Sequence, residues 1–256
     1  MRLIFLGTGT SMGVPVVACR CAVCQSDDWH DKHLRTSALV VTDAGENILI
    51  DIGPDFRYQM LREKVMHLEG ILITHAHRDH VAGLDDIRSF NYVQNKKMDL
   101  YCNKVARTAI ERDYHYIFAP HEFPGLPEAV IHELTGDEPS FRVGSVDVVP
   151  VKAIHKDMPV LGYRIGRLGY VTDANRIEPE ELDKLKGVEV LVINALRKKK
   201  HFSHFCLPEA LEVIETLSPR QAFITHVSHE MGLHAEVSKE LPPYVQIAYD
   251  GLKVEI

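Results

Sequence analysis

The densest cluster of potential metal ligands in the sequence is the segment Thr74–His80, which reads Thr-His-Ala-His-Arg-Asp-His. It follows directly on the apolar run Gly70–Ile73, which is typical of a strand. The candidate ligands are His75, His77, Asp79 and His80. Their close spacing does not allow all of them to surround one ion easily, but it can divide them into two pairs. Because imidazole and carboxylate ligands together suit Zn²⁺, Mn²⁺ or Fe, the motif indicates a dinuclear metal site.

Further candidate ligands come at the ends of other apolar, strand-like runs, and they are His155, Asp173 and His226. Taken singly, each is an ordinary polar residue at a strand end. Side chains from the ends of different strands can, however, converge on one rim of a sheet. All three residues follow the Thr74–His80 motif in the sequence. We therefore expect them to complete the ligand sets of the two ions.

The elements that must position these ligands are short apolar runs bounded by Gly, Pro, Asp or His, which predict strands. These runs are Leu3–Leu6, Ala38–Thr42, Ile48–Ile52, Ile71–Thr74, Val146–Val151, Val160–Ile165, Val188–Ile193, Ala222–Thr225 and Val245–Ala248. Helical patterns alternate with them: one follows His80, one begins at Pro179 and ends before Gly187, and one begins at Pro208. The alternation predicts a layered α/β fold, which we interpret as one domain over residues 1–256.

The stretch Tyr92–Pro127 is the least regular part of the sequence. Val105, Ile110 and Ile117 suggest a helix, which Pro120, Pro124, Gly125 and Pro127 then interrupt. We expect a loop or an insertion over the surface here. It could shape the rim of an active site or be a plain surface excursion.

Composition excludes several classes of protein. The 256 residues are 45% hydrophobic and 25% charged, as in globular proteins and unlike disordered or collagenous chains. The net charge of −7 argues against a general binder of polyanions, so nucleic acid is not an expected partner. The sequence has neither a signal peptide nor an apolar run long enough for a transmembrane helix. We therefore expect a cytoplasmic protein without a membrane partner.

Cys19, Cys21 and Cys24 form a tight cluster on a loop between early strands. In a cytoplasmic chain, crowded cysteines indicate metal binding more than disulfides. A closed tetrahedral zinc site needs one more ligand, and His229 is the candidate. The alternative is a reduced cysteine trio without a metal.

The order of these ligands along the chain resembles that of the metallo-β-lactamase-fold hydrolases, over essentially the whole sequence. The segments Leu6–Ser11 and Leu49–Gly53 look like the early strands of that superfamily. The resemblance implies a four-layer αβ/βα sandwich with two metal ions at one edge of its sheets. It also implies a ligand set: His75, His77 and His155 for the first ion, Asp79, His80 and His226 for the second, Asp173 as the bridge, and Asp51 as the residue that orients a ligand histidine.

A particular branch of the superfamily is the phosphodiesterases of the carbon–phosphorus lyase pathway. The chain resembles it in the Gly7–Gly9 opening, the cysteine loop and the ending Thr225–His229. This resemblance implies a structural zinc at the cysteines, a homodimer, and His204 as the proton donor to the leaving group. Asp79 and His204 are accordingly the expected catalytic residues. A surface histidine at a helix start is the alternative reading of His204, and His201 lies close enough to compete for the role.

The function that follows is hydrolysis of small, including cyclic, phosphodiesters by a metal-bridging hydroxide, with two active-site Mn²⁺ or Zn²⁺ ions. Alternatives are a tRNA 3′-processing-type endoribonuclease and a non-phosphodiester hydrolase or biosynthetic protein of the same fold, as in the pyrroloquinoline-quinone branch. A purely structural zinc protein is a further alternative. The run Arg197–Lys200 is either a solvated loop or a contact for an anionic substrate. The sequence leaves the natural substrate and the active-site metal open.

Overall fold

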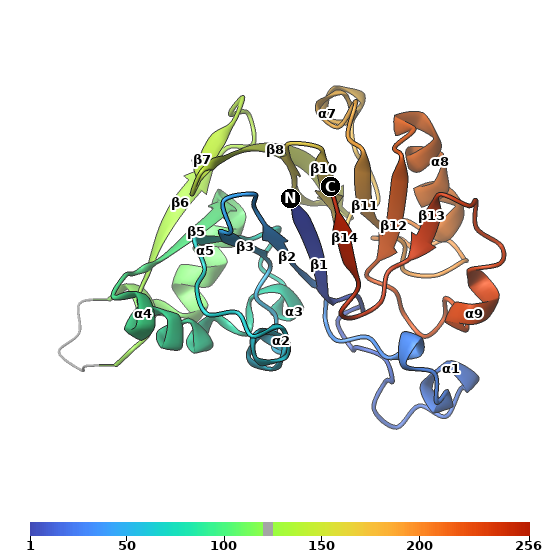
Figure 1. Cartoon of the computed structure of the whole chain (residues 1–256), viewed down its shortest axis with the longest axis horizontal. Coiled ribbons are helices and arrows are strands. Elements are labelled where there is room, and N and C mark those ends of the chain that lie inside the picture. Colours follow the sequence, from blue (N-terminus) through green and yellow to red (C-terminus); the bar gives the residue numbers. More distant parts are fainter. Residues whose placement is uncertain (120–124) are drawn as a thin grey trace.

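The computed structural model describes residues 1–119 and 125–256, and two mixed seven-stranded sheets form its interior. In spatial order the first sheet contains β14 (Lys253–Glu255), β1 (Arg2–Gly7), β2 (Ser37–Val41), β3 (Asn47–Ile50), β4 (Gly70–Leu72), β5 (Met98–Asn103) and β6 (Ala129–Leu134). The second contains β13 (Val245–Ile247), β12 (Gln221–Thr225), β11 (Val190–Asn194), β10 (Leu168–Val171), β9 (Met158–Ile165), β8 (Val146–His155) and β7 (Phe141–Val143). β1 pairs with β14, so the two ends of the chain lie side by side (Figure 1).

Helices cover the outer face of each sheet (Figure 1). On the first sheet lie α2 (Phe56–Glu63), α3 (Arg78–Val81), η2 (Leu84–Ile87), α4 (Arg88–Gln94), α5 (Lys104–Asp113) and α6 (His115–Phe118). On the second lie α7 (Pro179–Lys184), α8 (Leu207–Leu217) and α9 (His234–Val237). The cysteine loop contains α1 (Ala22–Gln25) and is followed by η1 (Trp29–Asp31).

The hydrophobic core lies in three layers that match this arrangement. Between the sheets, apolar side chains from both inner faces interlock, and the rings of Phe5 and Phe223 lie 5.5 Å apart across the interface. The Tyr163 hydroxyl donates a hydrogen bond of 2.6 Å to the carbonyl of Ile73 in the opposite sheet. The other two apolar layers join each sheet to its own helices. The predicted four-layer αβ/βα sandwich is therefore confirmed.

The parallel strands determine where functional side chains meet. β3, β4 and β5 run parallel in one sheet, and β10, β11 and β12 run parallel in the other. The segments that leave their carboxyl ends contain Asp51, the Thr74–His80 motif, Asp173 and His226. Since carboxyl ends of parallel strands open on the same edge of a sheet, both sheets deliver these residues to one rim.

The strands predicted from the sequence are all present within a few residues of their expected ends. The expectation of a loop or insertion over Tyr92–Pro127 is wrong for most of that stretch. It contains β5, which lies inside the first sheet between β4 and β6, and the predicted helix, which forms as α5 and α6. β5 was missed because Asp99 and Tyr101 alternate with its buried residues, and a strand of mixed polarity beside a proline-rich segment resembles a loop. Pro120 and Pro124 lie outside the described residues.

Among the described residues, no helix combines the length and the apolar composition that crossing a membrane would require.

Two glycines permit a close contact beneath the Thr74–His80 motif. The Ile52 amide donates to the His80 carbonyl at 2.8 Å, and the Gly83 amide donates to the Ile52 carbonyl at 2.9 Å. A Cβ atom at Gly53 would lie 2.2 Å from the carbonyl oxygen of Asp79, and one at Gly83 would lie 2.4 Å from that of Gly53. Because a side chain at either position would clash with backbone, glycine is required for the motif to sit against the end of β3.

We predict that Gly53→Ala lowers the amount of metal bound at the rim, because the added methyl group must displace Asp79 and its neighbours. The measurement is metal content per chain by plasma mass spectrometry. Gly45→Ala is the matched control: its φ of +82° is strained for alanine, at a cost of about 1 kcal/mol, but nothing lies within 4 Å of the added atom. Equal metal content in the two variants would contradict the prediction.

Candidate metal centre

Asp173 lies at the middle of the rim, with histidines from both sheets around its carboxylate. Its Oδ2 lies 2.6 Å from His80 Nε2 and 3.9 Å from His75 Nε2. Its Oδ1 lies 2.9 Å from His226 Nε2 and 3.1 Å from His204 Nδ1. Asp173 is 1% exposed, so it is shielded from water and faces these rings. A central carboxylate that reaches two groups of histidines has the geometry expected of a bridging ligand.

The other sequence-predicted ligands surround the same point. Asp79 Oδ2 lies 3.2 Å from His80 Nε2, and the His80 and His226 rings stack 5.6 Å apart. On the other side, the His77 ring lies 4.6 Å from that of His75 and 5.1 Å from that of His155. The structure thus brings together all the residues predicted for the dinuclear site: His75, His77, Asp79, His80, His155, Asp173 and His226.

Hydrogen bonds orient two of the motif histidines toward the centre. Asp51 Oδ2 accepts from His80 Nδ1 at 2.7 Å and from the Thr74 hydroxyl at 2.8 Å, while its Oδ1 accepts from the Thr74 amide. Because the Thr74 hydroxyl donates to Asp51, it accepts from His75 Nδ1 at 3.0 Å. Both imidazoles therefore carry a proton on Nδ1 and turn Nε2 toward the centre, where its lone pair would bind a metal.

Two residues that the sequence did not single out orient His226 and His155. The Thr36 hydroxyl donates to the Gly9 carbonyl at 2.8 Å, so it accepts from His226 Nδ1 at 3.1 Å. The carbonyl of Ser203 accepts from His155 Nδ1 at 2.7 Å. No sequence pattern marks Thr36, and the Ser203 contact is made by backbone, so neither was recognisable without the fold.

Backbone strain is concentrated at this rim. Asp51, Asp173 and His226 all take left-handed φ angles, of 60°, 52° and 56°. Such angles are costly for residues other than glycine and cluster at functional sites. Each of the three follows the end of a parallel strand, where the left-handed turn directs its side chain to the rim.

Several buried polar atoms at the centre have no hydrogen-bond partner of ordinary geometry, although they lie close together. They are His75 Nε2, His80 Nε2, both carboxylate oxygens of Asp173, and His204 Nδ1. Unpaired buried polar atoms are costly, and these converge instead of pairing. A divalent cation between them would accept their lone pairs, so the residues present fit a metal site.

The electrostatics also favour a cation. Burial alone raises the pKa of Asp173, but the charges of His226 and His80 outweigh it and hold the pKa of this carboxyl well below its usual range. Burial lowers the pKa of His80, but the carboxylates of Asp79 and Asp173 raise it well above its usual value. Without a metal, a proton on His80 thus balances the carboxylates. A bound divalent ion would take over that role.

His204 differs from His75, His80, His155 and His226, and resembles His77, in how its ring is held. Its Nδ1 faces Asp173, its ring stacks 5.0 Å from that of His226, and the side chain is 12% exposed. Within the described residues, no second-sphere hydrogen bond fixes its ring. His201 lies farther out, 5.3 Å from His204 by ring centres, with its Nδ1 near the hydroxyl of Ser203. Of the two, His204 is the one in contact with the metal-ligand cluster.

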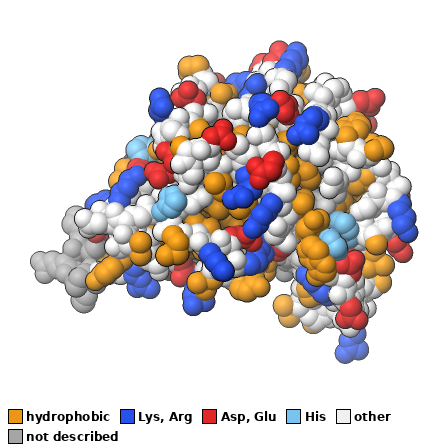
Figure 2. Space-filling model, in the orientation of Figure 1, with side chains coloured by type: hydrophobic (Ala, Val, Ile, Leu, Met, Phe, Trp, Pro, Cys, Tyr) orange, Lys and Arg blue, Asp and Glu red, His pale blue; other side chains and the backbone are white. Residues whose placement is uncertain are grey.

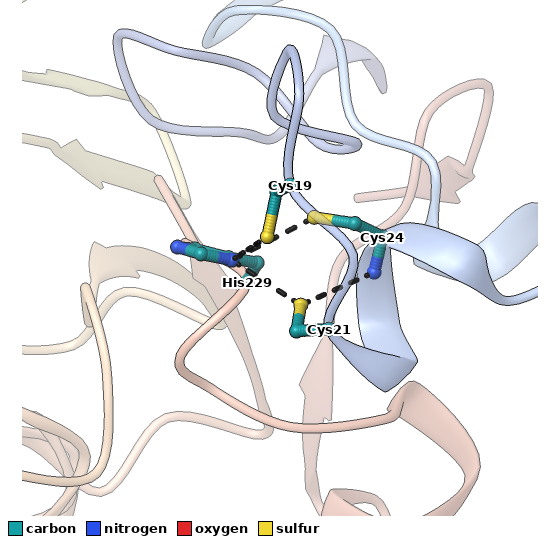
Figure 3. A group of neighbouring side chains, drawn as sticks. All are labelled: Cys19, Cys21, Cys24 and His229. Carbon is teal, nitrogen blue, oxygen red and sulfur yellow. Dashed lines mark hydrogen bonds between the residues drawn. The ribbon is translucent and has the colours of Figure 1, made fainter.

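The cysteine cluster forms a second, separate set of ligands. His229 Nδ1 lies 3.3 Å from the sulfurs of Cys19 and Cys21 and 3.6 Å from that of Cys24, and the four side chains point toward one another (Figure 3). One ring nitrogen cannot hydrogen-bond to three sulfurs at once. Bonds of about 2.0–2.3 Å to a tetrahedral zinc would, however, separate its ligands by about 3.5 Å. The arrangement therefore fits a closed Cys₃His zinc site.

Without a metal, thiolate formation at this second site is favoured at Cys21 and disfavoured at Cys24. The backbone amide of Cys24 and the ring of His229 lower the pKa of the Cys21 thiol to about 6. Burial raises the pKa of Cys24 to about 11 in the absence of a metal. A bound zinc ion would deprotonate Cys24 and compensate its burial.

The basic run Arg197–Lys200 is mostly engaged with acidic side chains. Arg197 Nη1 lies 2.5 Å from Glu230, Lys198 Nζ lies 2.7 Å from Glu240, and Lys200 Nζ lies 3.5 Å from Glu209. Arg197 also borders a cavity beside His204. Its pairing with Glu230 favours a structural role for the guanidinium over one as a free anion contact.

Comparison with known proteins decides the family. A family model described as "Beta-lactamase superfamily domain" matches residues 46–227. The chain belongs to this superfamily and has the metallo-β-lactamase fold. It is 36% identical to a structure titled "Crystal Structure of a New Diphosphatase from the PhnP Family", with a TM-score of 0.92 and coverage of 100% of this chain and 97% of that one. It is also similar to human tRNase Z, short form, with 19% identity and a TM-score of 0.72 over 100% of this chain and 99% of that one, a likeness of fold alone.

Among curated proteins, the chain is 41% identical over 257 residues to a protein named octanoyltransferase from Porphyromonas gingivalis (strain ATCC BAA-308 / W83). The match covers 100% of this chain but 52% of that protein, so the chain spans about half the length of this relative. It is 25% identical to coenzyme PQQ synthesis protein B of Methylobacterium sp. (strain 4-46), over 76% of this chain and 72% of that protein.

We predict that the two metal sites can be emptied separately. Asp173→Ala should lose metal at the rim, because it removes the carboxylate that both groups of histidines face, and should retain the zinc at the cysteines. Cys24→Ser should do the reverse, with partial unfolding of the cysteine loop. Metal content and a thiolate–metal absorption band after cobalt substitution distinguish the sites. Loss of the cobalt–thiolate band in Asp173→Ala would show that the sites are not separate.

Proposed function

We propose that this chain is a metal-dependent phosphodiesterase that acts on small phosphodiesters. The observation that carries the proposal is His204, a histidine outside the predicted ligand set whose Nδ1 lies 3.1 Å from the central carboxylate of the ligand cluster. Such a group suits proton transfer to a leaving oxygen, which ester hydrolysis needs. The 36% identity to a structure titled as a diphosphatase supports phosphorus as the atom attacked.

In this proposal His75, His77 and His155 would hold one ion, Asp79, His80 and His226 would hold the other, and Asp173 would serve both. When bound, the two ions would supply Lewis-acid stabilisation of the phosphoryl oxygens and an activated hydroxide at neutral pH. Asp51, Thr74, Thr36 and the Ser203 carbonyl keep four of the five ligand imidazoles, those of His80, His75, His226 and His155, oriented by an Nδ1 hydrogen bond.

His204 acts on the leaving group. A new P–O bond forms to the attacking oxygen, the bond to the leaving oxygen breaks, and that oxygen keeps the electron pair. It then takes the proton of the His204 imidazolium. The buried surroundings of His204 exclude most water from this transfer, since its side chain is 12% exposed.

A transfer of octanoyl groups is not part of the proposal. The match to the octanoyltransferase leaves about half of that protein unaligned, so the name of the whole protein does not assign that activity to this chain. The thiols of Cys102 and Cys206 are buried, and burial raises the pKa of both, to about 12 for Cys102. Neither is poised as a nucleophile.

A structured RNA substrate is also not favoured. The net charge is −7, and the face of the molecule in Figure 2 has basic and acidic side chains interspersed, without a basic stripe. Phosphate-backbone binding depends on clustered Lys and Arg. A small diester needs no such surface.

The proposal is tested by stripping the protein of metal, restoring Mn²⁺ or Zn²⁺, and measuring hydrolysis of bis(p-nitrophenyl) phosphate. p-Nitrophenyl phosphate, a p-nitrophenyl thioester and a nucleoside diphosphate are assayed beside it. Diester turnover that requires added metal is expected. Turnover of the thioester alone, or of the nucleoside diphosphate alone, would replace the proposal.

We predict that His204→Ala leaves the metals bound but slows cleavage of a 2′,3′-cyclic nucleotide by about 10²–10⁴-fold in kcat, as expected for loss of a general acid. The effect on bis(p-nitrophenyl) phosphate should be much smaller, because p-nitrophenolate leaves without protonation. His201→Ala is the neighbouring control. An equal loss of rate on both substrates would contradict the role of His204 as proton donor.

A further inference from the structure

Two cavities border the candidate metal centre. One, of about 480 Å³, is lined by His77, His155, Lys156, Asp157, Met158, Phe202 and Ser203. We call it the Phe202 cavity. The other, of about 300 Å³, is bordered by His204, Thr10, Ser11 and Arg197, and we call it the His204 cavity. Both reach the size of small-molecule sites, and they differ in chemistry.

The Phe202 cavity presents an exposed aromatic ring. Phe202 is 68% exposed although the next residue, Ser203, is buried, and the partly buried Met158 adds an apolar side chain to the lining. The ammonium of Lys156 lies 5.6 Å from the centre of the Phe202 ring. An exposed aromatic ring with an ammonium over one of its faces suits a planar ring that carries hydrogen-bond acceptors, because stacking needs a flat partner and the ammonium needs an acceptor.

Hydrogen bonds hold the walls of this cavity in place. Asn175 Oδ1 accepts from the Lys156 amide at 2.8 Å, and its Nδ2 donates to the Phe202 carbonyl at 3.4 Å. The next carbonyl, that of Ser203, accepts from the candidate ligand His155. The backbone under Phe202 is therefore fixed relative to the metal centre, so a ring stacked there would have a defined distance from the reacting phosphorus.

Lys156 occupies a strained position. It lies in the tight turn between β8 and β9, where His155 pairs with Met158, and it takes a φ of 59°. Hairpin turns usually place glycine, asparagine or aspartate at such angles. Lysine at this φ angle is less favourable for folding than glycine would be. Such strain is typical of functional sites, so we infer that the Lys156 side chain has a role in binding.

The His204 cavity is polar. Hydroxyls of Thr10 and Ser11 line it together with the ion pair of Arg197 and Glu230. Such walls suit a hydroxylated group. Because the proposed proton donor His204 borders this cavity, the leaving alkoxide belongs on this side and the retained ester on the other.

We propose that the substrate is a phosphodiester whose retained group bears a planar, nucleobase-like ring bound in the Phe202 cavity, and whose leaving group is a hydroxylated alcohol bound in the His204 cavity. This inference rests on the proposed function for the direction of cleavage. The assignment of Phe202 and Lys156 to a planar ring depends only on the walls of the cavity.

The test compares two diesters that share a leaving group: thymidine 5′-(p-nitrophenyl phosphate) and methyl p-nitrophenyl phosphate. The quantity measured is the ratio of their kcat/KM values. Phe202→Ala should lower this ratio about tenfold, the lower end of what loss of one base–aromatic stack produces. Phe202→Leu, which keeps apolar bulk without a flat face, should lower it almost as much.

Lys156→Gly is the second variant, chosen because it relieves the strained turn. Its unfolding temperature should not fall below that of the wild type, while the ratio should fall several-fold. A loss of discrimination in a protein of undiminished stability assigns the effect to the ammonium. A ratio unchanged in both Phe202→Ala and Lys156→Gly overturns the proposed ring site.

Binding of thymidine 5′-monophosphate, followed by calorimetry on the metal-loaded protein, separates this inference from the proposed function. Phe202→Ala should weaken the Kd about tenfold. If the wild type hydrolyses neither diester but its affinity for the nucleotide still depends on Phe202, the ring site stands and the phosphodiesterase proposal fails. If both diesters are cleaved and the affinity is independent of Phe202, the ring site is overturned and the proposed function stands.

Discussion

The rest of the structure depends on the burial of one carboxylate, that of Asp173, among imidazoles. A carboxylate removed from water is strongly unfavourable unless positive charge and hydrogen-bond donors replace the solvent. Here His80 and His226, which come from different sheets, lie within 3 Å of its two oxygens. The compensation can therefore form only when the two sheets are packed with their carboxyl edges aligned, which links the metal-ligand cluster to the sandwich itself.

A second sphere of contacts converts that packing into a defined ligand geometry. Each of His75, His80, His155 and His226 has its Nδ1 occupied, by Thr74, Asp51, Ser203 and Thr36 in that order. All four thus direct Nε2 inward. Among the described residues, neither His204 nor the candidate ligand His77 has such an anchor. His204 is set apart by its place outside the predicted ligand set, with its Nδ1 3.1 Å from Asp173. The short segment from His226 to His229 joins this cluster to the thiolate site, so the two sets of ligands share one loop.

Most of the candidate ligands and most of the strands that position them could be predicted from the sequence. The Thr74–His80 motif and the polar residues at strand ends were recognisable because ligand spacing and strand periodicity are local. β5 was not recognisable, because a strand inside a sheet need not be uniformly apolar. Its Asp99 pairs with Lys96 and His132 at the surface. Thr36 was not either, because its role depends on a contact with His226 across 190 positions of sequence. The left-handed angles of Asp51, Asp173 and His226 also follow from tertiary packing and have no sequence signature.

The central claim is that the rim holds two ions divided by Asp173 while the cysteines hold a third ion of a different kind. Anomalous X-ray scattering from crystals of the metal-loaded protein, recorded above and below the zinc and manganese absorption edges, tests it most directly. The account predicts two peaks on either side of the Asp173 carboxylate and one zinc peak enclosed by Cys19, Cys21, Cys24 and His229. A single peak at the rim, or none between the two groups of histidines, would contradict it.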